Sequence, residues 1–257
     1  MLGKPLEPLQ AADAAPSGLF GTIKYVSTED ELDAACRKLE DDLGPSTGII
    51  TCSVEQVDQW PVVMIHRPDP DFDGRNGSSA SGGAGAVRPR RNAETLLIDG
   101  CLRLGKAAIA RHLRRILKRK DVVKVCFGAE ALTSTLAPHV QAVFDIRLAT
   151  ELATGALCPS YEQTMAQLLD TKLLVPFPRT QRTVAGPLQR GCFDAFASRG
   201  TALYDAFNTL TRHHVSTPGE IGVVLSASTL RANDAGRLEV DAPGCKVAFD
   251  ATNQHRL

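Results

Sequence analysis

The sequence predicts an α/β fold built on one mixed sheet. Two observations support this: apolar runs of strand length follow one another between residues 48 and 100, and strand and helix patterns alternate from residue 106 to 155. Successive strands favour an antiparallel meander, whereas alternation with helices favours parallel strands. With 257 residues, of which 43% are hydrophobic, the chain is long enough for one such domain with a small appendage.

The first predicted elements are a strand over 22–27 and a helix that follows it. Thr28 precedes Glu29 and two further acids, and a hydroxyl before acids in a first turn is typical of a helix N-terminus. Leu32 and Leu39 fall on one face of this helix, and Gly44 ends it.

The meander is predicted from three runs, at 48–57, 60–68 and 94–100. Between the second and third runs lies a segment over 68–92 that is rich in Gly, Ser and Asp. Such a composition does not bury enough apolar surface to order itself, so we expect a flexible insertion.

The second half of the chain is predicted to alternate between strands and helices. The expected elements are a helix over 106–120, a strand over 122–128, a short helix over 131–139, a strand over 140–145, and helices over 146–155, 160–174 and 187–212. Residues 1–20, rich in Ala and Pro, are expected to be a flexible lead-in to one domain over 21–214. Residues 215–257 contain alternating apolar runs separated by turn signals, and they predict a small C-terminal β extension.

Composition limits the location and the partners of the protein. Lys plus Arg equals Asp plus Glu at 29 each, so any attraction to nucleic acid must be local. The absence of a long apolar run or a secretory leader predicts a soluble intracellular protein, cytoplasmic or nuclear, without membrane contact. The Ala- and Pro-rich start leaves mitochondrial import open, although Lys4 is the only basic residue before Lys24. Seven scattered cysteines without a CxxC pair indicate a reducing compartment and no zinc site.

A local basic patch is predicted on the helix over 106–120. Between Gly100 and Lys120 there are eight Lys and Arg residues and no acid. Six of them are candidates for salt-dependent, sequence-tolerant binding of RNA phosphates: Arg111, Arg114, Arg115, Lys118, Arg119 and Lys120. The alternative is an ordinary solvated helix face whose aliphatic stems cover the core.

Several phrases of the sequence resemble the ribonuclease D type of DnaQ-like (DEDD) 3′–5′ exonuclease domain. They are YVSTEDELDAACRKL, GIITCSVEQ, ETLLIDG, VVKVCFGAEALTSTL, AVFDIRLATELATG and PLQRGCFDAFASRGTALYDAF, in the order of that family. The resemblance covers roughly residues 22–212. It implies a ribonuclease H-like fold, in which an antiparallel meander extends into a mixed sheet flanked by helices.

The positions that carry metal ligands in this family hold other residues here. The family binds two divalent ions through four acids, because hard oxygen ligands and negative charge are needed to hold both cations. Matching the motifs puts Ser53 at the first acid, keeps Glu55, and puts Leu132 at the acid of the second motif. The third motif, Tyr-x-x-x-Asp, is matched to Phe196 and Gly200. The resemblance therefore implies a degenerate site with no intact catalytic set, no metal and no cofactor.

Three functions remain open at this point. Resemblance to catalytically inactive exonuclease-like adaptors implies RNA binding, protein partners in an RNA-processing complex, and a possible homodimer. A protein-interaction scaffold without RNA contact is the second, with the extension and the Pro-rich loop over 175–187 as its surfaces. The third is a divergent but active 3′–5′ exonuclease that uses Mg or Mn and recruits Glu130 or Asp194. Asp99 and Asp145 are expected to serve a turn and a helix cap.

Overall fold

The computed structural model describes residues 20–45, 48–57, 60–69, 90, 92–101, 104–136, 139–155, 160–169, 175–178 and 186–235. These residues form one six-stranded sheet with the order β1-β4-β3-β2-β5-β6. The strands are β1 (Thr22–Val26), β2 (Gly48–Val57), β3 (Trp60–Arg67), β4 (Glu94–Asp99), β5 (Val122–Cys126) and β6 (Val143–Asp145). β2, β3 and β4 are antiparallel, while β1 lies parallel to β4, and β5 and β6 continue parallel to β2. The predicted mixed sheet with its antiparallel meander is confirmed.

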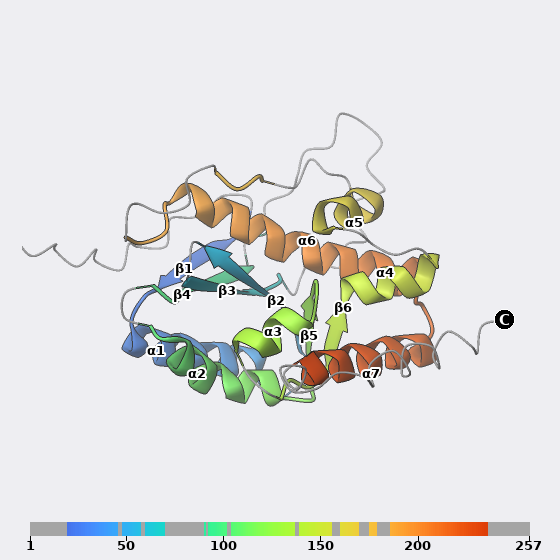
Figure 1. Cartoon of the computed structure of the whole chain (residues 1–257), viewed down its shortest axis with the longest axis horizontal. Helices are drawn as coiled ribbons and strands as arrows, with labels where there is room; N and C mark the ends of the chain where they lie inside the picture. The colour runs from blue at the N-terminus through green and yellow to red at the C-terminus, as the bar shows by residue number, and fades with distance from the viewer. Residues whose placement is uncertain are drawn as a thin grey trace, which may run out of the picture.

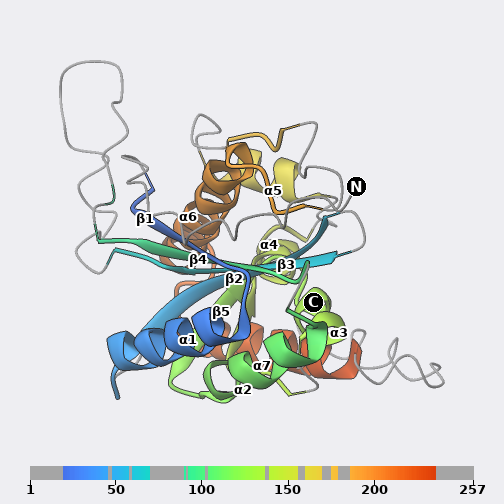
Figure 2. The ribbon, with the colours of Figure 1, turned by 90° about the vertical axis from the view of Figure 1, so that its left-hand side faces the viewer.

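Helices cover both faces of the sheet, as Figures 1 and 2 show. One layer contains α1 (Glu29–Leu43), α2 (Lys106–Lys118), α3 (Glu130–Thr135) and α7 (Pro218–Ala235). The opposite layer contains α4 (Ile146–Thr154), α5 (Tyr161–Leu168) and the long α6 (Gly191–His213). Among the described residues, no helix combines the length and the apolar surface needed to cross a membrane.

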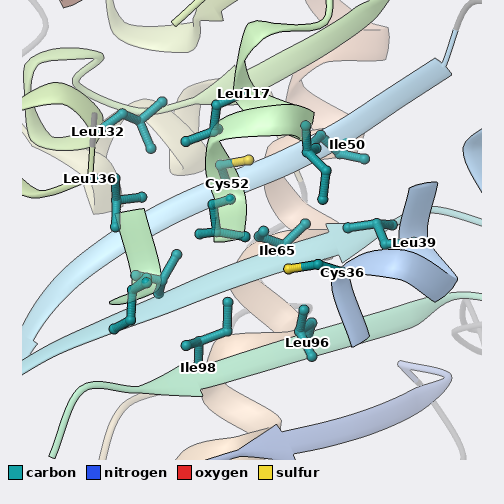
Figure 3. Packing of buried hydrophobic residues seen from close by; sticks show 14 of the residues in the cluster. Cys36, Leu39, Ile50, Cys52, Ile65, Leu96, Ile98, Leu117, Leu132 and Leu136 are labelled. Atoms are coloured by element: carbon teal, nitrogen blue, oxygen red, sulfur yellow. The ribbon is translucent and has the colours of Figure 1, made fainter. Parts of the chain in front are cut away.

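The alternation of side chains along the strands divides the core into two halves. Cys52 and Ile65 point toward α1 and α2, where they pack with Leu39 (Figure 3). Val62 and Met64 point toward α6 on the other face. Side chains of β2 that point toward α6 therefore lie between the sheet and the longest helix.

Local signals in the sequence set several helix ends. Thr28 and Glu31 form a capping box at the start of α1, in which each side chain accepts a hydrogen bond from the backbone of the other. Asp145 caps α4, and Gly155 ends that helix in the left-handed conformation with a φ of 70°.

The predicted β extension is wrong where the structure describes it, because Pro218–Ala235 forms α7. Thr217 and Glu220 form a second capping box, and the side chain of Thr217 accepts a hydrogen bond from the Glu220 amide at 3.2 Å. Val224 and Ser228 are buried while Ser226 between them is exposed, which is a helical and not a strand repeat. Residues 236–257, the lead-in over 1–19, and most of the expected insertion over 68–92 lie outside the described residues.

α7 satisfies the open edge of the sheet at β6 with side chains instead of a further strand. Ser228 accepts a hydrogen bond from the Asp145 amide and Thr229 accepts one from the Val143 amide, both at 3.0 Å. Asn233 accepts from the Val140 amide and donates to the Val140 carbonyl. These bonds satisfy edge groups that would otherwise be available to another strand.

Candidate functional site

The candidate site lies where β2 extends beyond its neighbour β5. Their pairing ends at Thr51 and Val125, so no strand of the described chain lies on that side of the C-terminal half of β2. A small hollow opens there, with room for about one water molecule. It is lined by β2, the end of β5 and the turn that follows, α3 and α6, through Cys52, Ser53, Val54, Glu55, Cys126, Phe127, Gly128, Ala131, Leu132, Arg199 and Leu203.

Three of the five motif positions meet in this hollow. Ser53 and Glu55 point toward it from β2, and Leu132 reaches it from α3 while also belonging to the core on the α1 side (Figure 3). Residues assigned to two separate motifs thus lie together.

Phe196 and Gly200, the residues matched to the third motif, do not line the hollow. Phe196 is fully buried against the ring of Phe177, with ring centroids 4.9 Å apart. Gly200 packs on β3, where a Cβ atom would come within 2.5 Å of His66 Cβ.

The residues that α6 contributes to the hollow are Arg199 and Leu203. Arg199 and Leu203 are four residues apart, as Phe196 and Gly200 are. Each lies three residues further along the helix than the matched motif position. Three residues rotate a helix position by about 60°, and this rotation separates the buried face of α6 from the face at the hollow. No local feature of the sequence indicates this rotation, because contacts with a distant strand set it.

Arg199 forms an ion pair with Glu55 inside the site. Its Nη1 atom lies 3.2 Å from Glu55 Oε1, and the side chain is 17% exposed. The guanidinium carbon lies 4.0 Å from the centroid of the Tyr161 ring and 5.8 Å from that of Phe177. The Tyr161 hydroxyl donates a hydrogen bond to the backbone carbonyl of Arg199 at 3.4 Å. Tyr161 therefore contacts Arg199 twice, with its ring at the guanidinium and with its hydroxyl at the backbone. Stacking on aromatic faces holds a guanidinium in a defined orientation.

The ionisation of Glu55 reflects this environment. Burial raises the pKa of the Glu55 carboxyl, the Arg199 charge lowers it in part, and the neighbouring Glu162 carboxylate raises it further. Burial also raises the pKa of the Tyr161 phenol. Tyr161 is buried, whereas the Glu55 side chain keeps about a third of its surface exposed at the mouth of the hollow.

The donor set of the hollow does not fit a pair of divalent cations. Ser53, Leu132 and Leu203 supply one hydroxyl and two aliphatic side chains, and Glu55 is paired with a guanidinium. Mg²⁺ and Mn²⁺ need several carboxylate or other hard oxygen ligands around each ion. Within the part of the chain that the structure describes, no three His, Cys, Asp or Glu side chains form a metal-binding group.

The two acids that could have been recruited have other places in the structure. Glu130 Oε1 lies 3.2 Å from Arg147 and 3.4 Å from Arg231, which joins α3 to α4 and α7. Asp194 is exposed in the first turn of α6. Neither residue lines the hollow.

Asp99 and Asp145 have the predicted turn and cap roles. Asp99 accepts hydrogen bonds from the Cys101 amide at 3.0 Å and from the Tyr25 hydroxyl at 2.6 Å. Asp145 also accepts from the amides of Gly128 and Ala129 at 3.0 and 2.8 Å. It therefore holds the turn that forms one wall of the hollow, a role that its sequence neighbourhood did not indicate.

The predicted basic patch lies on α2, in the layer of α1 and away from α6 (Figure 2). Acids compensate three of its six cations: Arg111 pairs with Glu29, Arg115 lies 4.0 Å from Glu40, and Arg119 pairs with Asp121. The other three, Arg114, Lys118 and Lys120, are exposed, and no acid of the described chain pairs with them. The free positive charge of this face is thus about half of what the sequence suggested.

Comparison with known proteins identifies the fold and little more. No family model matches the sequence, and no curated protein matches it significantly. A solved structure described as the apo form of the nuclease is 17% identical, with a TM-score of 0.51, over 85% of this chain and 93% of that one. NrnC from Brucella melitensis bound to pGG is 15% identical, with a TM-score of 0.50, over 86% of this chain and 94% of that one. The catalytic core of RRP6 from Trypanosoma brucei is 14% identical, with a TM-score of 0.49, over 82% of this chain and 52% of that one.

These similarities support one fold class. The chain has the fold of DnaQ-like, ribonuclease H-like 3′–5′ exonucleases, at low sequence identity. At such identity the similarity concerns the fold alone, so function must be argued from the site.

Proposed function

We propose that this chain is an exonuclease-like domain without nuclease activity that binds RNA, as an adaptor or as a subunit of an RNA-processing complex. The observation that carries the proposal is the ion pair of Arg199 with Glu55 in the hollow. A guanidinium there neutralises Glu55, the one carboxylate among the described residues that line the site. It also adds positive charge next to the place where a cation would bind. Metal binding would have to break this pair and would still lack ligands.

Support for RNA binding comes from the fold and from the free cations of α2. The NrnC structure of this fold is described as bound to pGG. Arg114, Lys118 and Lys120 are exposed together at the C-terminal part of α2 and just after it. Three phosphate contacts with a single strand predict a slope of about −2 in a plot of log affinity against log salt concentration.

The proposal is tested with purified protein and a labelled single-stranded RNA, followed by gel shift and by length, with and without Mn²⁺. We expect a salt-sensitive shift and no shortening. Replacing Arg114, Lys118 and Lys120 by Gln should weaken the shift. Replacing the compensated Arg111 and Arg115 by Gln is the matched control and should weaken it much less.

Two other results would contradict the proposal. Shortening of the RNA from its 3′ end that depends on Mn²⁺ and disappears in Glu55→Ala would show that the domain is a divergent but active exonuclease. Absence of any shift at low salt would remove RNA from the proposal.

A protein scaffold without RNA contact is the second candidate, and one observation favours it. Val223 and Leu230 are 48% and 53% exposed and lie seven residues apart, on one side of α7. Large apolar side chains at this spacing suit a helix that packs against a second protein. Sedimentation or light scattering of the wild type and of a Val223→Ser, Leu230→Ser variant tests whether this side of α7 forms a homodimer.

A further inference from the structure

We propose that the hollow beside β2 binds a single phosphate group of RNA directly, through the Arg199 guanidinium and the Ser53 hydroxyl. The site would thus accept an anion at the place where the resembling exonucleases hold cations. This inference rests on the proposed function, because it assigns the hollow to RNA binding. It adds a second contact to the exposed cations of α2.

The guanidinium has hydrogen-bond donors to spare. An Arg side chain carries five N–H donors, and among the described residues Glu55 is the only acid paired with Arg199. One contact at 3.2 Å is also less than the two parallel hydrogen bonds that guanidinium and carboxylate form at their best. Donors therefore remain for a phosphate, whose oxygens suit the same planar fork.

The position of Arg199 is fixed before any ligand arrives. The Tyr161 ring lies 4.0 Å from the guanidinium carbon, and Tyr161 is itself buried with Phe127 packed edge-on against it. Little conformational freedom is left for Arg199 to lose on binding. Such preorganisation increases affinity without adding contacts.

A second polar group at the hollow lacks a partner. Ser53 Oγ is buried, and no atom of the described residues forms a hydrogen bond with it. Ser53 and Glu55 are two residues apart on β2, so their side chains lie on the same face of the strand. A phosphate oxygen at the hollow would accept the hydrogen bond that the Ser53 hydroxyl does not make in the free protein.

The size of the hollow limits the ligand to a small group. It has room for about one water molecule, which is far too little for a nucleobase or a ribose. Phe127, Leu132 and Leu203 close its walls. An oxygen of a phosphate group fits this space while the sugar and the base remain outside.

Glu55 competes with the anion for Arg199, so the proposal predicts that loss of this carboxylate increases RNA affinity. Its carboxylate shares the guanidinium with the ligand and repels the phosphate charge. Replacing Glu55 by Gln should release Arg199 and strengthen RNA binding. In an active exonuclease of this fold, loss of the carboxylate would instead remove a metal ligand.

The experiment measures the affinity of a labelled single-stranded RNA by fluorescence anisotropy at fixed salt, in the presence of EDTA. We expect about a tenfold loss in Arg199→Met, about a threefold loss in Ser53→Ala, and a severalfold gain in Glu55→Gln. Arg147→Met is the matched control, because Arg147 is also a half-buried, ion-paired arginine but does not line the hollow, and it should leave the affinity unchanged. Circular dichroism checks folding, and Arg199→Lys, which keeps the charge without the planar fork, should lie between wild type and Arg199→Met.

The source of the phosphate is distinguished by three probes. Equal binding of RNA with and without a 3′ phosphate indicates an internal phosphodiester, whereas preference for the 3′ phosphate indicates the end of the chain. Competition by millimolar inorganic phosphate that is lost in Arg199→Met supports the site and shows that a free phosphate also enters it.

The failure of this inference differs from the failure of the proposed function. If the Arg199 and Glu55 variants bind RNA as the wild type does, while the variant of Arg114, Lys118 and Lys120 binds weakly, the hollow is not a phosphate site and the proposed function stands. If the wild type binds no RNA, both proposals fail. A loss of affinity in Glu55→Gln, or binding that EDTA abolishes, overturns the direct anion contact.

Discussion

Gly200 lies where α6 crosses β3, and its lack of a side chain allows the close approach of helix and sheet. A Cβ atom at this position would lie 2.5 Å from His66 Cβ, 2.8 Å from His66 Cγ and 3.0 Å from Met64 Sδ. The Thr51 hydroxyl also donates to the Gly200 carbonyl at 3.0 Å, so the backbone is held on a second strand. Gly200→Ala must therefore move α6 or the strands.

The expected cost follows from two opposing effects. A methyl group forced into a packed core costs about 1–3 kcal/mol, and the upper part of this range applies because the nearest atom is a Cβ fixed to the backbone. Replacing Gly by Ala within a helix contributes about 1 kcal/mol in the other direction. We expect Gly200→Ala to lower the free energy of unfolding by about 2 kcal/mol.

Gly222 provides the matched control within α7. A Cβ atom there would meet nothing within 4 Å, so only the helix propensity changes. Gly222→Ala should raise the free energy of unfolding by about 0.5–1 kcal/mol. Guanidinium denaturation followed by circular dichroism measures both variants, and equal stabilisation of the two would refute the close packing of α6 on β3.

Two further predictions concern buried charge. Burial lowers the pKa of His66 from 6.5 to about 3, with the positive charges of Arg90 and Arg67 adding to the effect. The unfolded chain thus binds a proton near pH 6.5 that the folded chain does not bind until near pH 3, so stability falls as the pH falls through this window. Between pH 7 and 4.5 the loss should be about 2.5 kcal/mol, and His66→Gln should remove this part of the pH dependence in urea titrations. An unchanged difference between the two pH values would contradict the neutral buried state of His66. Arg90 is bound to Asp205 by contacts of 2.8 and 2.6 Å and both side chains are largely buried, so Arg90→Met should cost about 3–5 kcal/mol by leaving the carboxylate unpaired. Removing the exposed Arg37, paired with Asp33, should cost under about 1 kcal/mol, and similar costs for the two would show that the Arg90 pair is solvated.

Much of the fold could be predicted because its signals are local. The capping box at Thr28 and the glycine at 155 mark helix ends through the residues that stand next to them. The strands of the meander are apolar runs of strand length, and their pairing needs only short connections or one insertion.

The C-terminal helix shows a prediction that failed although a signal was present. The run GEIGVVLSAS is rich in residues that favour strands, and turn-like segments follow it. However, Thr217 and Glu220 have the spacing of a capping box, and Pro218 stands at the first helical position, where proline is favoured. Start signals of this kind outweigh a weak strand propensity.

The third motif could not have been placed from sequence alone. Phe196, Arg199, Gly200 and Leu203 all belong to one helix, and any of the possible rotations would look equally helical. The rotation is set by the contact of Gly200 with His66 on β3, more than a hundred residues away in the chain. Spacing within a helix fixes which residues share a face, but only tertiary packing decides where that face points.

The rotation of α6 brings Arg199 to the hollow, and this gives a physical reason for the presence of Glu55 there. A partly buried carboxylate without a partner is costly to ionise, and burial raises the pKa of Glu55. Arg199 compensates the charge, and the hydroxyl and aliphatic groups of Ser53, Leu132 and Leu203 add no second charge that would need a partner. Under the proposed function, Glu55 is the counter-ion of Arg199 and not a remaining metal ligand. On this view the two residues form one unit, so removing either should change how the hollow treats an anion, in opposite directions.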